Sequence, residues 1–130
     1  MYERLYEVAK KNDCEVVKSD FYKVESNKKK YSKVTPIDFL YHQIISFKTH
    51  PSIFNFQSVN QIGIYRLDLF RINQIKLNET PGASYQDNGL WFQIFAFAKT
   101  IYFINEAFYM LRRDNPNSSV KSKEINRSNF

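Results

Sequence analysis

A single acid, Asp87, stands between a loop-forming stretch and a strongly apolar one. The residues before it read NETPGASYQ, where Pro81 and Gly82 fix the path of the backbone. The residues after it, NGLWFQIFAFA, place large apolar side chains at helical spacing. Aspartate is a preferred N-cap, because its carboxylate accepts the free N–H groups of the first helical turn. A carboxylate held rigidly at such a position can also act as a general base towards a hydroxyl group.

Two adjacent arginines, Arg112 and Arg113, follow the last apolar stretch and precede the sequence DNPNSS. Guanidinium groups match phosphate oxygens in a two-pronged fashion, and the hydroxyls of Ser118 and Ser119 would add donors. The alternative is a strand end whose charged side chains simply face water. The residues alone leave both alternatives open.

Common phosphate, metal and nucleophile motifs are absent from the sequence. It contains no Gly-rich phosphate loop, no H-E-x-x-H and no G-x-S-x-G. No two of its aspartates form a D-x-D pair.

Cys14 is the only cysteine, so no internal disulfide can form, and a reducing compartment is favoured. The net charge of +6 suits an anionic partner, such as a nucleotide, a sugar diphosphate, a nucleic acid or an acidic membrane surface.

The elements that must position these residues alternate between helices and strands, which predicts an α/β fold with helices packed on a sheet. The helix over 35–47 has favourable start chemistry, with Thr35 as N-cap, Pro36 in the first position and Asp38 in the third. In the first half of the chain, we predict a helix over 1–12, a strand over 14–24, a solvated basic loop over 25–33 and a helix over 35–47. A strand near 61–64 and a short helix carrying Leu67 and Phe70 should follow. The last part should contain a loop over 79–86, a helix over 87–100, and two short strands over 101–104 and 107–113.

The stretch ETPGASYQDNGLWFQIFAFAKTIYFINEAFYMLRRDNPNSSV resembles the distal part of a glycosyltransferase family 2 domain. The similarity is to bacterial enzymes that build surface polysaccharides. It extends upstream to IYRLDLFRINQIKLNE and to YERLYEVAKKNDCEVVKSDFY. This resemblance implies the C-terminal part of a GT-A fold, which is a Rossmann-like mixed sheet with flanking helices. It also implies inverting transfer of a sugar from a nucleotide-diphosphate sugar to an acceptor hydroxyl, in surface polysaccharide or lipopolysaccharide synthesis.

The resemblance assigns roles to individual residues. By that match Asp87 is the catalytic base, so one carboxylate would serve as both cap and base. Arg112 stands at the family's arginine near the donor diphosphate. Gln86, Arg113, Ser118 and Ser119 would assist donor binding, and Pro81, Gly82, Ser84 and Trp91 would shape the acceptor side. Three positions depart from the family pattern: Gln86 replaces the usual glutamate, Leu111 replaces an aromatic residue, and Asn60 lies where a tryptophan is expected.

The resemblance also implies that residues 1–119 form the acceptor-side half of the domain, followed by a polar tail over 120–130. The nucleotide-binding half would carry the D-x-D motif and its divalent metal, Mg or Mn, so we expect the isolated chain to be inactive. The implied partners are a nucleotide-sugar donor, a glycan or lipid-linked acceptor, and either the missing half or a second copy. We expect no nucleic-acid partner, at most peripheral membrane contact, and a location in the cytoplasm or at the inner face of the membrane. The alternative function is a non-catalytic assembly or dimerisation module derived from such an enzyme.

Overall fold

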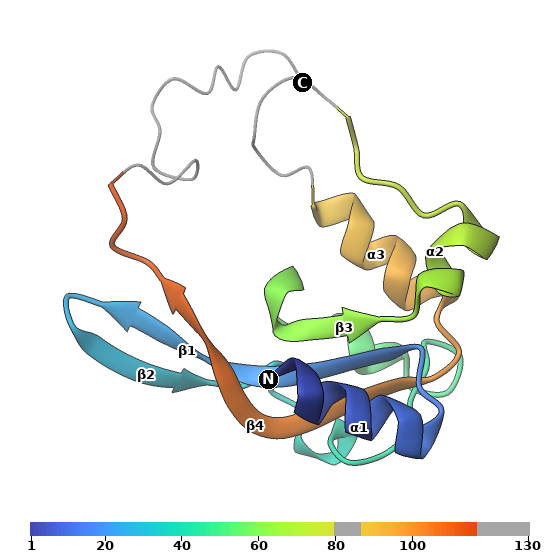
Figure 1. Cartoon of the computed structure of the whole chain (residues 1–130), viewed down its shortest axis with the longest axis horizontal. Helices are drawn as coiled ribbons and strands as arrows, with labels where there is room; N and C mark the ends of the chain where they lie inside the picture. Colours follow the sequence, from blue (N-terminus) through green and yellow to red (C-terminus); the bar gives the residue numbers. More distant parts are fainter. Residues whose placement is uncertain (80–86, 117–130) are drawn as a thin grey trace.

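Strand β1 (Val16–Glu25) is the central element of a mixed four-stranded sheet in an α/β fold (Figure 1). The computed structural model describes residues 1–79 and 87–116. The remaining elements in chain order are α1 (Tyr2–Asn12), β2 (Lys28–Ser32), β3 (Gly63–Tyr65), α2 (Leu67–Asn73), α3 (Asn88–Phe97) and β4 (Ile101–Arg112), with short 3-10 turns at Asp38–Leu40, Pro51–Phe54 and Asn60–Ile62.

β1 pairs with each of the other three strands. It runs parallel to β4, with Val16 opposite Ile101, and antiparallel to β2 and β3. Parallel pairing requires a long connection between the two strands, and here residues 26–100 supply it. The first strand and the last strand therefore form the backbone of the sheet.

The sheet is covered on both faces, as expected for a layered α/β fold. Val17 and Ile104 pack with Leu5 and Val8 of α1 in a smaller core. Alternate residues point to the opposite face, where the larger core lies. That core includes Val16, Phe21, Leu40, Ile45, Ile53, Ile62, Leu69, Ile94, Phe95, Ile101 and Phe103.

Sequence reasoning predicted α1, β1, α2 and α3 as elements, with boundaries that differ by a few residues. The strand expected near 61–64 is also present, as β3. These elements have the clearest periodicity of apolar residues, so tertiary contacts reinforce their local preference.

The basic segment over 25–33 is not a loop, which corrects the prediction. Lys28–Ser32 forms strand β2, antiparallel to the end of β1. The two central turn residues, Ser26 and Asn27, both have positive φ, of 46° and 62°. Two such residues make the tight turn whose twist matches a β-hairpin.

The helix predicted over 35–47 is also wrong. Only a 3-10 turn at Asp38–Leu40 forms there, and Tyr41 and Ile45 bridge to Phe103 and Ile101 of β4. The segment thereby covers part of the edge of β4. Pairing with a strand edge satisfies backbone groups that a free helix would satisfy internally, so tertiary context overrides the favourable helix-start chemistry.

The final two short strands are one strand, β4. Its register against β1 shifts where Ser19 faces Ile104 and Asp20 faces Ala107. Asn105 and Glu106 are thus extra residues in a bulge, which bends a strand without ending it. Asn105 and Glu106 therefore mark an irregularity in the strand, but β4 continues on both sides of them.

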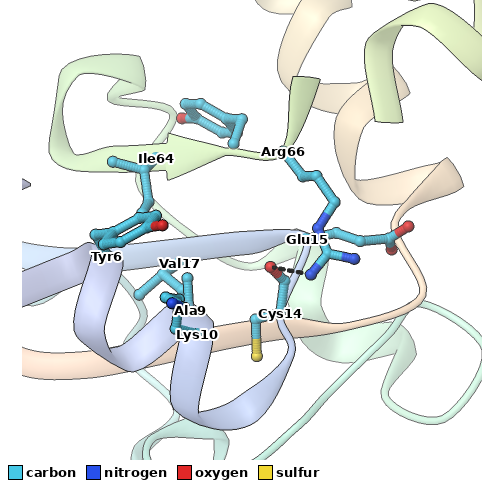
Figure 2. Close-up of a pocket in the computed structure, with 9 residues that line it drawn as sticks. Tyr6, Ala9, Lys10, Cys14, Glu15, Val17, Ile64 and Arg66 are labelled. Carbon is cyan, nitrogen blue, oxygen red and sulfur yellow. Dashed lines mark hydrogen bonds between the residues drawn. The ribbon is translucent and has the colours of Figure 1, made fainter. Parts of the chain in front are cut away.

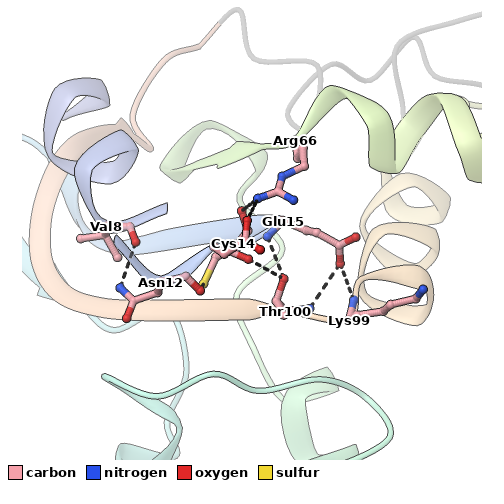
Figure 3. A network of polar contacts seen from close by, with 8 residues as sticks. Val8, Asn12, Cys14, Glu15, Arg66, Lys99 and Thr100 are labelled. Atoms are coloured by element: carbon pink, nitrogen blue, oxygen red, sulfur yellow. Dashed lines mark hydrogen bonds and ion pairs between the residues drawn. The ribbon is translucent and has the colours of Figure 1, made fainter. Parts of the chain in front are cut away.

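A polar network around Glu15 joins three parts of the fold (Figure 3). The Glu15 carboxylate accepts the backbone N–H of Lys99 at 2.6 Å, and Thr100 Oγ1 accepts the N–H of Glu15 at 3.0 Å. The N–H of Arg66 donates to the Glu15 carbonyl at 2.7 Å. These bonds tie the start of β1 to the α3–β4 connection and to the start of α2, and so fix the position of α3.

Candidate functional site

Asp87 lies at the N-cap position of α3, as predicted, but its carboxylate does not cap the helix. Its backbone carbonyl accepts the N–H groups of Leu90 and Trp91, at 3.1 and 3.3 Å. The side chain is exposed, and Oδ2 accepts a hydrogen bond from Nδ2 of Asn60 at 3.3 Å. The carboxylate is therefore contacted by an amide from another part of the chain, and no residue within 1–79 and 87–116 donates a hydrogen bond to its second oxygen.

The position of Asn60 is set by hydrogen bonds to the backbone of residues 59–62. The Tyr65 hydroxyl donates to the Asn60 carbonyl at 2.9 Å, and Lys18 Nζ donates to the Val59 carbonyl at 2.9 Å. Burial raises the pKa of Tyr65, which keeps its hydroxyl protonated as a donor. Ser19 Oγ lies 3.2 Å from the Ile62 carbonyl. The central strand and β3 thus hold the turn that presents Asn60 to Asp87.

Trp91 lies one helical turn after Asp87 and belongs to an aromatic cluster. Its ring meets Phe56 edge-on, with centroids 5.1 Å apart, and lies 6.1 Å from Phe54. Such contacts leave a tryptophan little freedom to rotate. The structure therefore brings Trp91 and Asp87, two of the predicted site residues, to the same end of α3.

Within residues 1–79 and 87–116, two buried side-chain atoms have no hydrogen-bond partner: Oδ1 of Asn60 and Nε1 of Trp91. Buried polar groups in native proteins are almost always paired, so each exception requires an explanation. One atom is an acceptor and the other a donor, which is the complement that a sugar hydroxyl or a bridging water needs. Asn60 contacts the Asp87 carboxylate and Trp91 lies one helical turn after Asp87, so these three residues mark the candidate site.

Lys18 lies beneath the site and is completely buried. Its Nζ lies 5.0 Å from the centroid of the Phe56 ring and 5.8 Å from that of Phe95. Burial lowers the pKa of Lys18 from 10.5 to about 7, whereas the rings and the Val59 carbonyl favour the ammonium. The side chain joins the sheet to the turn that carries Asn60.

The predicted arginines lie at a different place, at the end of β4. Arg112 is opposite Val24 in the sheet register, and its Nε donates to Asp114 Oδ1 at 2.7 Å. The N–H of Arg113 donates to the Val24 carbonyl at 2.9 Å. Both side chains are exposed. Within residues 1–79 and 87–116, neither arginine has a hydrogen bond or ion pair to Asp87.

Six predicted site residues lie outside the described residues: Pro81, Gly82, Ser84, Gln86, Ser118 and Ser119. Their roles stay predictions. Sequence reasoning noticed Asn60 as a departure from the family pattern but gave it no role towards Asp87. It did not identify Lys18, because a lysine in a strand normally indicates a solvent-facing position.

A second polar cluster surrounds Asp20, which is fully buried. Its carboxylate accepts the Tyr41 hydroxyl at 2.6 Å, the backbone N–H of Val34 at 2.7 Å, and the Tyr31 hydroxyl. Burial and the neighbouring carboxylate raise the pKa values of both tyrosines. Residues from β1, β2 and the 34–41 segment are joined here, so the cluster has a clear structural role.

A cavity of about 180 Å³ lies on the other face of the sheet, between α1 and β3 (Figure 2). Ala9, Val17 and Ile64 are among the residues that line it. The Arg66 guanidinium at its rim is paired with Asp13 and also donates to the Cys14 carbonyl. Burial raises the pKa of the Cys14 thiol to about 11, so the thiol is unreactive at neutral pH. The Arg66 guanidinium is thereby used in holding the α1–β1 connection to the start of α2.

The described residues around Asp87 do not form a site for a divalent metal. Across the described part of the chain, no three His, Cys, Asp or Glu side chains come together to hold one. Asp87 has an amide as its neighbour, and a hard cation would require more oxygen ligands.

In residues 1–79 and 87–116, no helix has the length and apolar character needed to cross a bilayer.

No model of a known protein family matches the chain, and no curated protein matches it in sequence. Among solved structures, the fold is similar to TarS 1-349 of S. aureus, a staphylococcal wall teichoic acid glycosyltransferase. The TM-score is 0.59 at 15% sequence identity, with 84% of this chain and 31% of that chain covered. The chain therefore spans about a third of the TarS structure that it resembles. The likeness shows an α/β fold shared with part of a glycosyltransferase chain.

Proposed function

We propose that the chain forms the acceptor side of an inverting glycosyltransferase, with Asp87 as the general base. The observation that carries the proposal is the exposed Asp87 carboxylate at the start of α3, which accepts a hydrogen bond from Asn60, whose own Oδ1 is buried without a partner among the described residues. The fold likeness to part of a glycosyltransferase supports the reaction class. The donor is a nucleotide-diphosphate sugar, and the acceptor is a glycan or lipid-linked hydroxyl in surface polysaccharide synthesis.

In the proposed reaction, Asp87 takes the proton of the acceptor hydroxyl as that oxygen forms a bond to the anomeric carbon. The bond between the anomeric carbon and the diphosphate breaks in the same displacement, which inverts the configuration. Asn60 restricts the carboxylate to one orientation, and proton transfer requires hydrogen-bond reach. Oδ1 of Asn60 and Nε1 of Trp91 would bind neighbouring hydroxyls of the acceptor.

The donor side of this proposal rests on the predicted residues at the end of β4. Arg112 would bind the diphosphate, with Gln86, Arg113, Ser118 and Ser119 assisting. A divalent metal, supplied with the rest of a complete enzyme, would stabilise the leaving diphosphate. Because the described residues offer no such metal site, we expect the 130-residue chain to bind acceptors without turning over.

Acceptor binding can be measured directly, because Trp91 is the only tryptophan of the chain and lies at the site. Its fluorescence should change on titration with oligosaccharides of the surface-polysaccharide class, with millimolar or tighter affinity. Asp87→Asn should weaken binding roughly tenfold, because a carboxylate accepts a stronger hydrogen bond than an amide does. Lys48→Gln, an exposed change on another element, is the control and should leave the titration unchanged.

Two results would contradict this proposal. Absence of any glycan response at millimolar concentration would remove the acceptor site. A response that Asp87→Asn leaves intact would remove the assignment of the base. Robust donor-dependent glycosylation by the pure chain would contradict only the expected inactivity, and would show that the chain is catalytically complete.

A second function, a non-catalytic assembly or dimerisation module, is favoured by exposed apolar side chains around α2 and α3. Ile72 is 78% exposed and Phe92 is 53% exposed, and Leu67, Leu77 and Phe97 are about half exposed. Exposed apolar clusters of this kind often mark contact surfaces. Sedimentation equilibrium separates the two functions, because a monomer at high micromolar concentration argues against the module.

A further inference from the structure

The β1–β2 hairpin carries most of the net charge of the chain. Residues 23–33 contain five lysines and one glutamate, which leaves four of the six net positive charges in eleven residues. Figure 1 shows that this hairpin extends beyond the helices at one end of the sheet. Asp87 and Asn60 have no hydrogen bond or ion pair to these lysines within the described residues, so a role for the hairpin is independent of the proposed function.

Three of the lysines lie on one face of the hairpin. Lys23 is opposite Lys30, and Glu25 is opposite Lys28, so these four side chains share a face. Lys28 and Lys30 are exposed. Like charges directly opposite each other destabilise a strand pair. Nζ of Lys23 lies 5.7 Å from the centroid of the Phe21 ring, whereas Lys30 is exposed.

The other face of the hairpin is partly apolar. The ring of Tyr22 is covered by Lys29, whose Nζ lies 3.7 Å from the ring centroid, and by the edge of Tyr31. Tyr31 is 43% exposed, and Met110, opposite Tyr22 in β4, is 57% exposed. The hairpin therefore combines several lysines with exposed apolar and tyrosine side chains.

We infer that this hairpin docks on an anionic phospholipid surface. Clustered lysines bind acidic headgroups through charge alone, and the face with Lys23, Lys28 and Lys30 presents such a cluster. Nucleic acid fits less well, because single strands bind by stacking bases on open aromatic faces, and Lys29 already occupies the face of Tyr22. The contact is peripheral, and this lysine face of the hairpin lies against the headgroups.

The inference can be tested by cosedimentation of the full chain with vesicles. Phosphatidylcholine vesicles containing phosphatidylglycerol should bind the chain, and pure phosphatidylcholine vesicles should not. Binding should disappear in about 1 M salt, where charges are screened beyond roughly 3 Å. The double variant Lys28→Gln/Lys30→Gln should bind roughly thirtyfold more weakly, on the basis of the usual contribution of each lysine near such a surface.

The matched control is Lys10→Gln/Lys11→Gln on α1. It also removes two exposed lysines, so its net charge equals that of the hairpin variant. Retained binding by the α1 variant and lost binding by the hairpin variant support docking through the hairpin. Equal losses in both variants would overturn it, because only net charge would then matter. Absence of vesicle binding, or tighter binding to an oligothymidine than to the anionic vesicles, would also overturn it.

Discussion

At the scale of single residues, the relation between Asp87 and Asn60 decides what the site can do. Asp87 was predicted from its place between a loop and an apolar helix, and its position at the start of α3 is confirmed. The role of its carboxylate could not be predicted, because the choice between the helix N–H groups and an external partner depends on a residue 27 positions away. Asn60 donates to the carboxylate from outside the helix, and the helix N–H groups do not bind it.

The Asp87–Asn60 contact gives a direct prediction for Asn60. Asn60→Ala should weaken glycan binding by three- to tenfold, because it removes one acceptor atom and the donor that orients Asp87, worth about 1 kcal/mol. Trp91 fluorescence measures that loss. In the NMR spectrum, the side-chain amide signals of Asn60 should shift when Asp87 is replaced in Asp87→Asn.

The exposed change Lys48→Gln is the control, and there the Asn60 amide signals should keep their positions. If the amide signals of Asn60 were the same in Asp87→Asn as in the unaltered chain, the two side chains would not be in contact. Asn60 would then have no positioning role.

At the scale of elements, local signals predicted helices well when their apolar face met the sheet and failed when a strand edge competed. Thr35, Pro36 and Asp38 form a favourable helix start, yet the segment after them pairs with β4. The Thr35 hydroxyl instead donates to the Asn55 carbonyl and accepts the N–H of Ile37. The deciding residue is Asp20, whose buried carboxylate binds this segment from β1, and a single sequence gives no indication of that distant contact.

This account of the 34–41 segment predicts the effect of removing one hydroxyl group. Tyr41→Phe should lower the free energy of unfolding by about 2 kcal/mol, because the buried carboxylate of Asp20 loses a donor. The change should appear as a lower urea midpoint at an unchanged slope. Tyr6→Phe on the exposed side of α1 should shift the stability by less than about 0.5 kcal/mol. A midpoint for Tyr41→Phe equal to that of the unaltered chain would show that Asp20 does not hold the segment.

At the scale of the whole molecule, the α/β class could be predicted from the alternation of helical and strand patterns, and it is confirmed. The burial of β1 on both faces could not be predicted from the order of elements alone. VVKSDF places Lys18 and Asp20 where an alternating strand would face water. Because β4 returns to pair beside β1 and helices cover both faces, these polar side chains become core residues.

The burial of Lys18 makes the stability of the whole molecule depend on pH. Its pKa is lowered from 10.5 to about 7 in the folded chain, so between these values the unfolded chain binds more protons. Stability should therefore rise with pH above about 7, by about 1.4 kcal/mol per pH unit, and Lys18 should add no slope below it. Urea unfolding from about pH 6 to about pH 9 measures this slope, which Lys18→Met should remove and the exposed-site control Lys30→Met should retain. A slope that survives in Lys18→Met would mean that Lys18 stays charged in the fold, because the Val59 carbonyl and the two aromatic faces then outweigh its burial.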